Sequence, residues 1–248
     1  QLPIGICGVA IGVAAMPLLA RHAANKNIAE LKNTFVSAQT MVFCLTIPAA
    51  VGLFILAEPI IRLIFERGAF TSADTIATAQ ALALYSIGLF AYSSNKVLVP
   101  VFYAIEKPHF PVIASFMAIC TNIIFINLTI QYFQHRAIAL SVSVTMVINF
   151  IFLTTILYRE LKGFSLRQML TAILKIVTAT ILMIIFLRAS IFFTDNLLHT
   201  SNIFILSFTL FSIILIAVVV YCAALYFLKL SEFLEITTKI QQKLFCGK

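Results

Sequence analysis

Seven apolar stretches separated by short charged breaks constrain this chain more than any other feature of its sequence. They cover residues 4–20, 35–57, 76–103, 110–133, 137–158, 169–193 and 203–228. A helix needs about 20 apolar residues to cross a bilayer, and all but the first stretch have that length. With 62% hydrophobic and only 10% charged residues, the chain is too apolar for a water-soluble domain. We therefore predict an all-α polytopic membrane protein, a helical bundle of about seven transmembrane segments.

The sequence carries no pattern typical of an enzyme or of a metal site. It lacks GxSxG, HExxH, Walker A and GxGxxG motifs, its four histidines are scattered among different loops, and its five cysteines show no metal-ligand spacing. We predict no enzymatic activity, no cofactor and no metal. The net charge of +8 is expected in cytoplasmic loops rather than in a nucleic-acid patch, so we predict no nucleic-acid partner.

The distribution of Lys and Arg between alternate breaks predicts the orientation. One side holds eleven, Arg21, Lys26, Lys32, Lys107, Arg159, Lys162, Arg167, Lys229, Lys239, Lys243 and Lys248, and the other holds four, Arg62, Arg67, Arg136 and Arg188. The positive-inside rule then predicts a cytoplasmic C-terminus and an outer residue 1. Because the chain begins with Gln1 and its first apolar stretch is short, we expect the C-terminal part of a longer protein, with a truncated first helix.

A solitary lysine in the third stretch is the candidate substrate-binding residue. Lys96 is the only Lys, Arg, Asp, Glu or His between Ile76 and Tyr103, and a cation at membrane depth is costly unless it is paired or reaches the interface. Pro100 lies four residues later and has no N–H for the Lys96 carbonyl, which predicts a kink and a helix hinge there. The alternative is that Lys96 only snorkels to the headgroups, which we also expect of Lys175.

Residues 58–67 predict a short amphipathic helix at the outer interface. Glu58 and Pro59 resemble the start of a helix that Gly68 ends, and its Arg62 and Arg67 are candidate anion contacts, with headgroup binding as the alternative. The next helix begins near Thr71 and Asp74, which have the spacing of a capping box. Pro48, within the second stretch, leaves a carbonyl for a neighbouring helix or water to satisfy.

Several segments resemble one transporter family. They are the turn FERGAFTSADT, the run YSIGL, KVLVPVFYA with Lys96, the following KPHFP, and AIALSVSVTMVIN; residues 2–23 fit as well. Together they resemble the MurJ (MviN) lipid II flippases of the multidrug/oligosaccharidyl-lipid/polysaccharide exporter superfamily. The resemblance covers nearly the whole chain and is loosest after about residue 165.

The resemblance implies a 14-helix transporter of two lobes followed by an extra helix pair. Residues 1–160 would form the C-terminal lobe of the core, 161–230 the extra pair, and 231–248 a cytoplasmic amphipathic tail. Lys96 matches a lysine that lines the central cavity of the family. Some relatives have an acidic sodium ligand in the eleventh helix, and the corresponding stretch here, NIIFINL, has no acid, which argues against sodium coupling.

The function implied is flipping of lipid-linked peptidoglycan precursor across the bacterial inner membrane by alternating access, for cell-wall synthesis and cell shape. The implied partners are that precursor, membrane lipids and the N-terminal lobe of the same protein. The alternatives are an exporter of another polyprenyl-linked glycan or a drug, and a non-transporting membrane scaffold.

Overall fold

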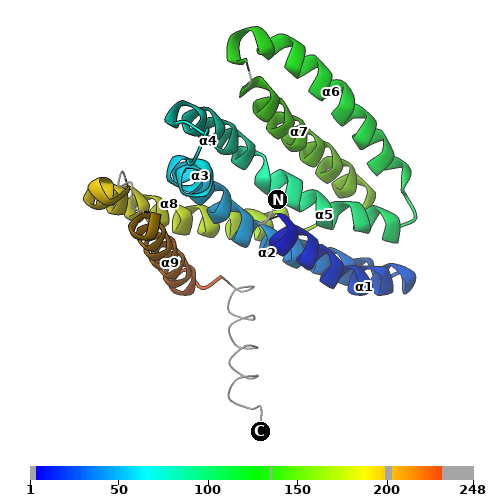
Figure 1. Ribbon diagram of the computed structural model, residues 1–248. Helices are drawn as coiled ribbons and strands as arrows, with labels where there is room; N and C mark the ends of the chain where they lie inside the picture. The colour runs from blue at the N-terminus through cyan, green and yellow to red at the C-terminus, as the bar shows by residue number, and fades with distance from the viewer. Residues whose placement is uncertain (1–3, 135, 199–202, 231–248) are drawn as a thin grey trace.

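The computed structural model describes residues 4–134, 136–198 and 203–230, and every regular element in these ranges is a helix (Figure 1). A π-helical turn, Ile4–Val9, leads into α1. The α-helices are α1 (Ala10–Ala24), α2 (Ile28–Ile55), α3 (Ala57–Phe65), α4 (Ser72–Ile87), α5 (Leu89–Ala104), α6 (His109–Phe133), α7 (Arg136–Glu160), α8 (Leu166–Leu198) and α9 (Ile203–Phe227). The predicted all-α class is confirmed. The predicted tail, residues 231–248, lies outside the described residues.

The described helices account for the predicted membrane segments. Five of them, α2, α6, α7, α8 and α9, are each long and apolar enough to cross a membrane. The helices α4 and α5 pass the same test of length and composition only when taken together, as a pair bent by 41° at the break between them. The helix α1 is apolar but has only 15 residues, in agreement with the short first segment expected from the sequence.

The helices α1, α2, α5 and α7 enclose one hydrophobic core. Its fully buried members include Leu19, Phe35, Leu98, Phe102 and Leu157. Small residues allow the π-helical turn and α1 to approach α5 closely: a Cβ atom added to Gly8 of the turn would lie 3.0 Å from the Ser93 Cα, and one added to Gly12 of α1 would lie 2.5 Å from the Lys96 carbonyl oxygen. The glycines therefore set the spacing of these two helices.

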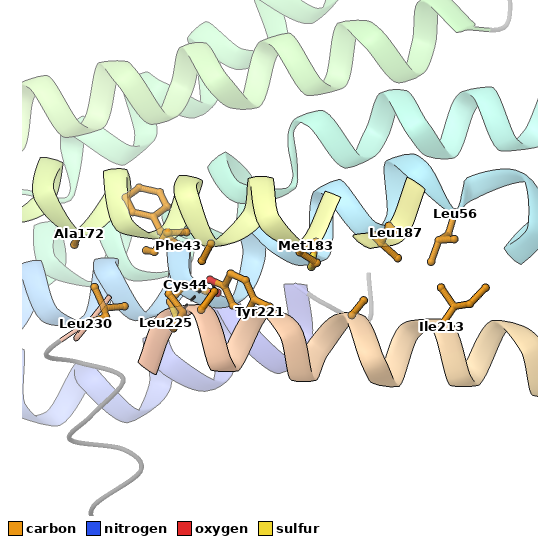
Figure 2. Packing of buried hydrophobic residues seen from close by; sticks show 14 of the residues in the cluster. Phe43, Cys44, Leu56, Ala172, Met183, Leu187, Ile213, Tyr221, Leu225 and Leu230 are labelled. Carbon is orange, nitrogen blue, oxygen red and sulfur yellow. Dashed lines mark hydrogen bonds between the residues drawn. The ribbon is translucent and has the colours of Figure 1, made fainter. Parts of the chain in front are cut away.

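A second core joins the pair α8–α9 to α2. Figure 2 shows Met183 and Leu187 of α8 and Ile213 and Leu225 of α9 pointing into the space between the two helices. Lys175 of α8 donates from Nζ to the Lys229 carbonyl oxygen at 2.9 Å. In Figure 1 this pair lies on the opposite side of the molecule from the α6–α7 hairpin.

The break between α4 and α5 lies at Gly88. A Cβ atom at this position would lie 2.7 Å from the Ser143 Cα of α7, so only glycine fits. Pro100 lies inside α5, which continues through it to Ala104. The structure therefore places the break twelve residues before the proline that sequence reasoning selected, and a hinge at Pro100 stays a prediction.

The turn before α4 has the structure that the sequence predicts. The N–H group of Thr71 donates to the Asp74 carboxylate at 2.9 Å and that of Asp74 to the Thr71 hydroxyl at 3.4 Å, which confirms the capping box. Gly68 has φ +64°, as its place in the turn requires. The helix α3 begins at Ala57, one residue before the expected start, and ends at Phe65, before Gly68. Ile61 of this helix is buried and Glu58 is exposed, but the apolar Ile64 is exposed as well, so its place at the outer interface stays a prediction.

Candidate functional site

The Lys96 side chain lines a cavity of about 430 Å³ between α5, α6 and α7. The helix α5 contributes Tyr92, Asn95, Lys96 and Pro100, α6 contributes Pro111 and Ser115, and α7 contributes Met146 and Asn149, among others. Lys96 is itself exposed, so the hollow that it faces is open to the surface of the described residues.

The ammonium group of Lys96 has an aromatic partner and no acidic one. Its Nζ lies 5.0 Å from the centroid of the Tyr92 ring, within the range of a cation–π contact. Tyr92 precedes Lys96 by four residues, so both side chains lie on one face of α5. Among the described residues, no carboxylate lies within 4.0 Å of Lys96. The positive charge is thus available to an anion that enters the cavity.

The other polar groups of the cavity differ in whether they have hydrogen-bond partners within the protein. Asn149 donates from Nδ2 to the Ala114 carbonyl at 3.2 Å, and the Ser115 hydroxyl donates to the Pro111 carbonyl at 2.9 Å. The side-chain oxygen of Asn95 is buried and accepts no hydrogen bond from the described residues. It is therefore an acceptor for water or for a donor on a bound molecule.

The backbone at Lys96 is shaped by Pro100 and Gly12. Pro100 has no N–H group, so the Lys96 carbonyl has no partner in its own helix. Gly12 packs directly against that carbonyl, because a Cβ atom added at Gly12 would lie only 2.5 Å from the carbonyl oxygen. Such an approach is typical of a Cα–H···O contact between helices.

A larger, apolar cavity of about 550 Å³ lies between α1, α2, α8 and α9. It is lined by residues such as Pro48, Leu56, Met183 and Leu187. Ile11 of α1 lines this cavity, and the next residue, Gly12, contacts the backbone of Lys96. Neither Gly12 nor any other residue of α1 lines the Lys96 cavity, so the two cavities are separate.

The structure does not bring the two candidate arginines to Lys96. Arg62, on α3, lies between Glu58 at 3.1 Å and Glu66 at 3.5 Å, and Arg67 donates to the Ile64 carbonyl at 2.7 Å. Neither lines the Lys96 cavity. The anion contacts predicted for them stay a prediction.

Sequence reasoning missed Tyr92 and Asn95. The signal for Tyr92 was its spacing of four residues from Lys96; nothing in the sequence marked Asn95 as lining a cavity. No group of three or more potential metal ligands was found among the described residues.

A bundle of membrane-spanning helices with a lone cation facing a cavity is the architecture of a membrane transporter. The sequence model of the family described as lipid II flippase MurJ matches residues 1–209. The chain belongs to this family.

Sequence identity to individual members of the family supports this assignment. The chain is 30% identical over 244 residues to the probable lipid II flippase MurJ of Buchnera aphidicola subsp. Schizaphis graminum, covering 98% of this chain and 47% of the relative. It is 35% identical over 187 residues to that of Buchnera aphidicola subsp. Acyrthosiphon pisum, covering 75% of this chain and 37% of the relative.

A solved structure of lipid II flippase MurJ in an inward closed conformation superposes with a TM-score of 0.69 at 27% identity. The match covers 90% of this chain and 43% of that structure. The chain thus spans less than half the length of these relatives.

Proposed function

We propose that this chain contributes to a transporter that flips lipid-linked peptidoglycan precursor, lipid II, across the bacterial inner membrane. The observation that carries the proposal is the lone Lys96 ammonium at a cavity between membrane-spanning helices of a MurJ family member. The protein moves its substrate and does not transform it, so it is not an enzyme. Its activity serves cell-wall synthesis.

Lys96 binds the diphosphate of the substrate. An ammonium group is a compact point charge with three donors, which suits a phosphate, and within a membrane its attraction to that phosphate grows as water is excluded from the cavity. When no substrate is present, the Tyr92 ring supports the ammonium in place of an anion. The free Asn95 oxygen accepts a hydrogen bond from a hydroxyl or amide group near the diphosphate.

The apolar cavity takes the polyprenyl tail. Its lining is almost entirely hydrocarbon, and because the tail comes from an equally apolar bilayer, van der Waals packing rather than removal from water holds it there.

Transport by alternating access requires a second lobe that rocks against this one. We assign residues 1–160 to the C-terminal lobe, 161–230 to an extra helix pair and 231–248 to a tail, and we expect an N-terminal lobe as partner. Pro100 serves as a hinge of α5. The excess of Lys and Arg on one side supports a multi-pass orientation with the C-terminus in the cytoplasm.

Complementation tests this proposal. The intact protein, with Lys96 changed to Ala, Glu or Arg, is expressed in a bacterium depleted of its own lipid II flippase. We expect Lys96→Ala and Lys96→Glu to abolish growth and Lys96→Arg to retain part of it, because only Arg keeps the charge.

Lys175 offers the matched control. It is also a lysine in an apolar helix, but its Nζ donates to a main-chain carbonyl and does not line the Lys96 cavity. We expect Lys175→Met to support growth when membrane levels, measured by immunoblot, equal those of the unmodified protein. Growth of Lys96→Ala cells at the normal rate would contradict the assignment.

A further inference from the structure

Three phenylalanine rings meet between α2, α5 and α7. The ring centroids of Phe43 and Phe90 lie 6.4 Å apart, those of Phe43 and Phe150 lie 6.0 Å apart, and those of Phe90 and Phe150 lie 6.1 Å apart. Each of the three helices contributes one ring, and each ring contacts the other two. This ring triangle holds the three helices together at one level of the bundle.

The relative directions of the three helices follow from contacts at one end of the bundle. The ion pair between Lys107 and Glu160 joins the turn after α5 to the end of α7, so these two helices run parallel to each other. The rings of Phe35 and Phe164, 5.3 Å apart, join the first turns of α2 to the residues after α7, so α2 runs antiparallel to α5 and α7. A step backward along α2 therefore reaches the same level as a step forward along α5 or α7.

On each of the three helices, a polar residue lies four positions from the ring and on the same side of the ring triangle. These polar residues are Gln39 on α2, Ser94 on α5 and Thr154 on α7. Residues four apart lie on one face of a helix, so the three polar side chains are directed to the same region as the three rings. Gln39 is 1% exposed and Ser94 is 0% exposed. The chain thus places a polar layer inside an apolar bundle.

Much of the hydrogen-bonding capacity of this polar layer is unused within the described residues. Neither Nε2 nor Oε1 of Gln39 has a partner there, nor does Oγ1 of Thr154, and all three atoms are buried. The Ser94 hydroxyl donates to the Phe90 carbonyl at 2.7 Å, which leaves its oxygen as an acceptor. Because a buried polar group without a partner is costly and rare, a bound molecule is needed to complete these bonds.

A neighbouring cavity provides space beside the polar layer. It has a volume of about 290 Å³ and is lined by Thr154 and all three rings of the triangle, together with Met169 and Ile173 of α8. None of the described residues that line it is charged. The polar layer therefore borders open space, through which a small neutral molecule can enter.

We propose that Gln39, Ser94 and Thr154 hold buried water between α2, α5 and α7. Water accepts from Nε2 of Gln39 and from the Thr154 hydroxyl, and it donates to Oε1 of Gln39 and to Oγ of Ser94. A buried water molecule typically makes about three such bonds. These three side chains offer N–H and O–H donors and no carboxylate, which favours water over a metal cation. The proposal does not depend on the identity of the transported substrate.

Radiolytic footprinting tests the proposal directly. A short X-ray pulse converts water into hydroxyl radicals, which oxidise the side chains beside it, and mass spectrometry locates the oxidised residues. In the intact protein in detergent, we expect oxidation of Phe43, although it is only 3% exposed, and no oxidation of Phe102, which is 0% exposed. Gln39→Leu and Thr154→Val should each reduce the oxidation of Phe43, and the double variant should reduce it to the level of Phe102.

Thr155→Val is the matched control. Thr155 lines the same cavity as Thr154, but its hydroxyl already donates to the Ile151 carbonyl at 2.7 Å. We therefore expect Thr155→Val to leave the oxidation of Phe43 unchanged.

The sign of a stability change provides a second test. If the Gln39 amide had no partner at all, Gln39→Leu would raise the unfolding temperature, because it removes a buried unsatisfied group. If the amide is bonded to water, the same variant lowers the unfolding temperature, because it leaves the Thr154 hydroxyl without its partner. We expect the lower temperature.

Three outcomes would overturn the proposal. One is a Phe43 ring that stays as unreactive as Phe102, which would mean that no water lies beside it. Another is unchanged oxidation of Phe43 in the double variant, which would show that the water belongs to the apolar cavity and is not held by the polar layer. The third is a higher unfolding temperature for Gln39→Leu.

Discussion

The Tyr221 hydroxyl of α9 donates a 2.7 Å hydrogen bond to the carbonyl oxygen of Cys44, in the middle of α2 (Figure 2). This carbonyl would normally accept from the N–H group four residues later, but that residue is Pro48. A tyrosine 177 positions away in the sequence thus completes the hydrogen bonding of a proline-containing helix. The same bond fixes α9 against α2.

We predict that Tyr221→Phe destabilises the protein through loss of this bond alone. The side chain is buried, and an interhelical hydrogen bond in a membrane protein contributes about 0.6 kcal/mol on average and up to about 1.7 kcal/mol. Thermal or denaturant unfolding in detergent measures the change. Exposed Tyr226 is the control, and Tyr226→Phe should have no effect.

A double-mutant cycle with Pro48 separates the bond from other effects of the substitution. In a Pro48→Ala background the N–H group of residue 48 can bond to the Cys44 carbonyl, so Tyr221→Phe should cost less there. Equal costs in both backgrounds would mean that the hydroxyl does not compensate for the proline.

At the break between α4 and α5, we predict that a serine and a glycine both stabilise the fold, each for a different reason. The Gly88 N–H group turns to the Tyr85 carbonyl, and the Ser143 hydroxyl instead donates to the Leu84 carbonyl at 2.6 Å. Ser143→Ala should therefore destabilise the fold by about 1 kcal/mol. Gly88→Ala should be worse, by about 1–3 kcal/mol, because its methyl group meets the backbone of Ser143. The unfolding midpoints of the two variants measure these losses. A Gly88→Ala variant as stable as the unmodified protein would exclude the close packing of Gly88 against Ser143.

A pair of glycines tests the contact of α1 with Lys96. Gly12→Ala places a methyl group 2.5 Å from the Lys96 carbonyl, whereas a methyl group at Gly52 of α2 meets nothing within 4 Å. We predict that Gly12→Ala lowers both stability and complementation, while Gly52→Ala raises stability by as much as about 1 kcal/mol through helix propensity. If both variants behaved alike, the glycine at position 12 would not be needed for helix approach.

Tyr92 is predicted to hold the Lys96 ammonium through its ring and not its hydroxyl. Tyr92→Phe should keep complementation near normal, and Tyr92→Leu should reduce it, since a cation–π contact contributes about 0.5–2 kcal/mol. Tyr103 lines the same cavity without a recorded contact to the ammonium, so Tyr103→Leu is the matched control. Growth rates at equal protein levels provide the comparison, and identical effects of Tyr92→Leu and Tyr103→Leu would refute a specific role.

Local signals in the sequence predicted much of the fold. The long apolar stretches located the spans, and the spacing of Thr71 and Asp74 located the start of α4. The break at Gly88 escaped prediction because its cause is Ser143 on a distant helix, whereas Pro100 offered a local reason for a kink. Asn95 escaped for the same reason, because burial of its oxygen depends on how three helices meet.

By itself the sequence determined that the chain is a bundle of membrane helices and that Lys96 is the one charged residue of its third apolar stretch, because hydropathy and charge are properties of each residue. The tertiary structure alone decided which groups satisfy the backbone carbonyls at Cys44 and Leu84, and that Lys96 faces a cavity beside Tyr92. The physical reason is that a hydrogen bond or a cavity between helices depends on side chains brought together from distant parts of the chain, which no local pattern specifies.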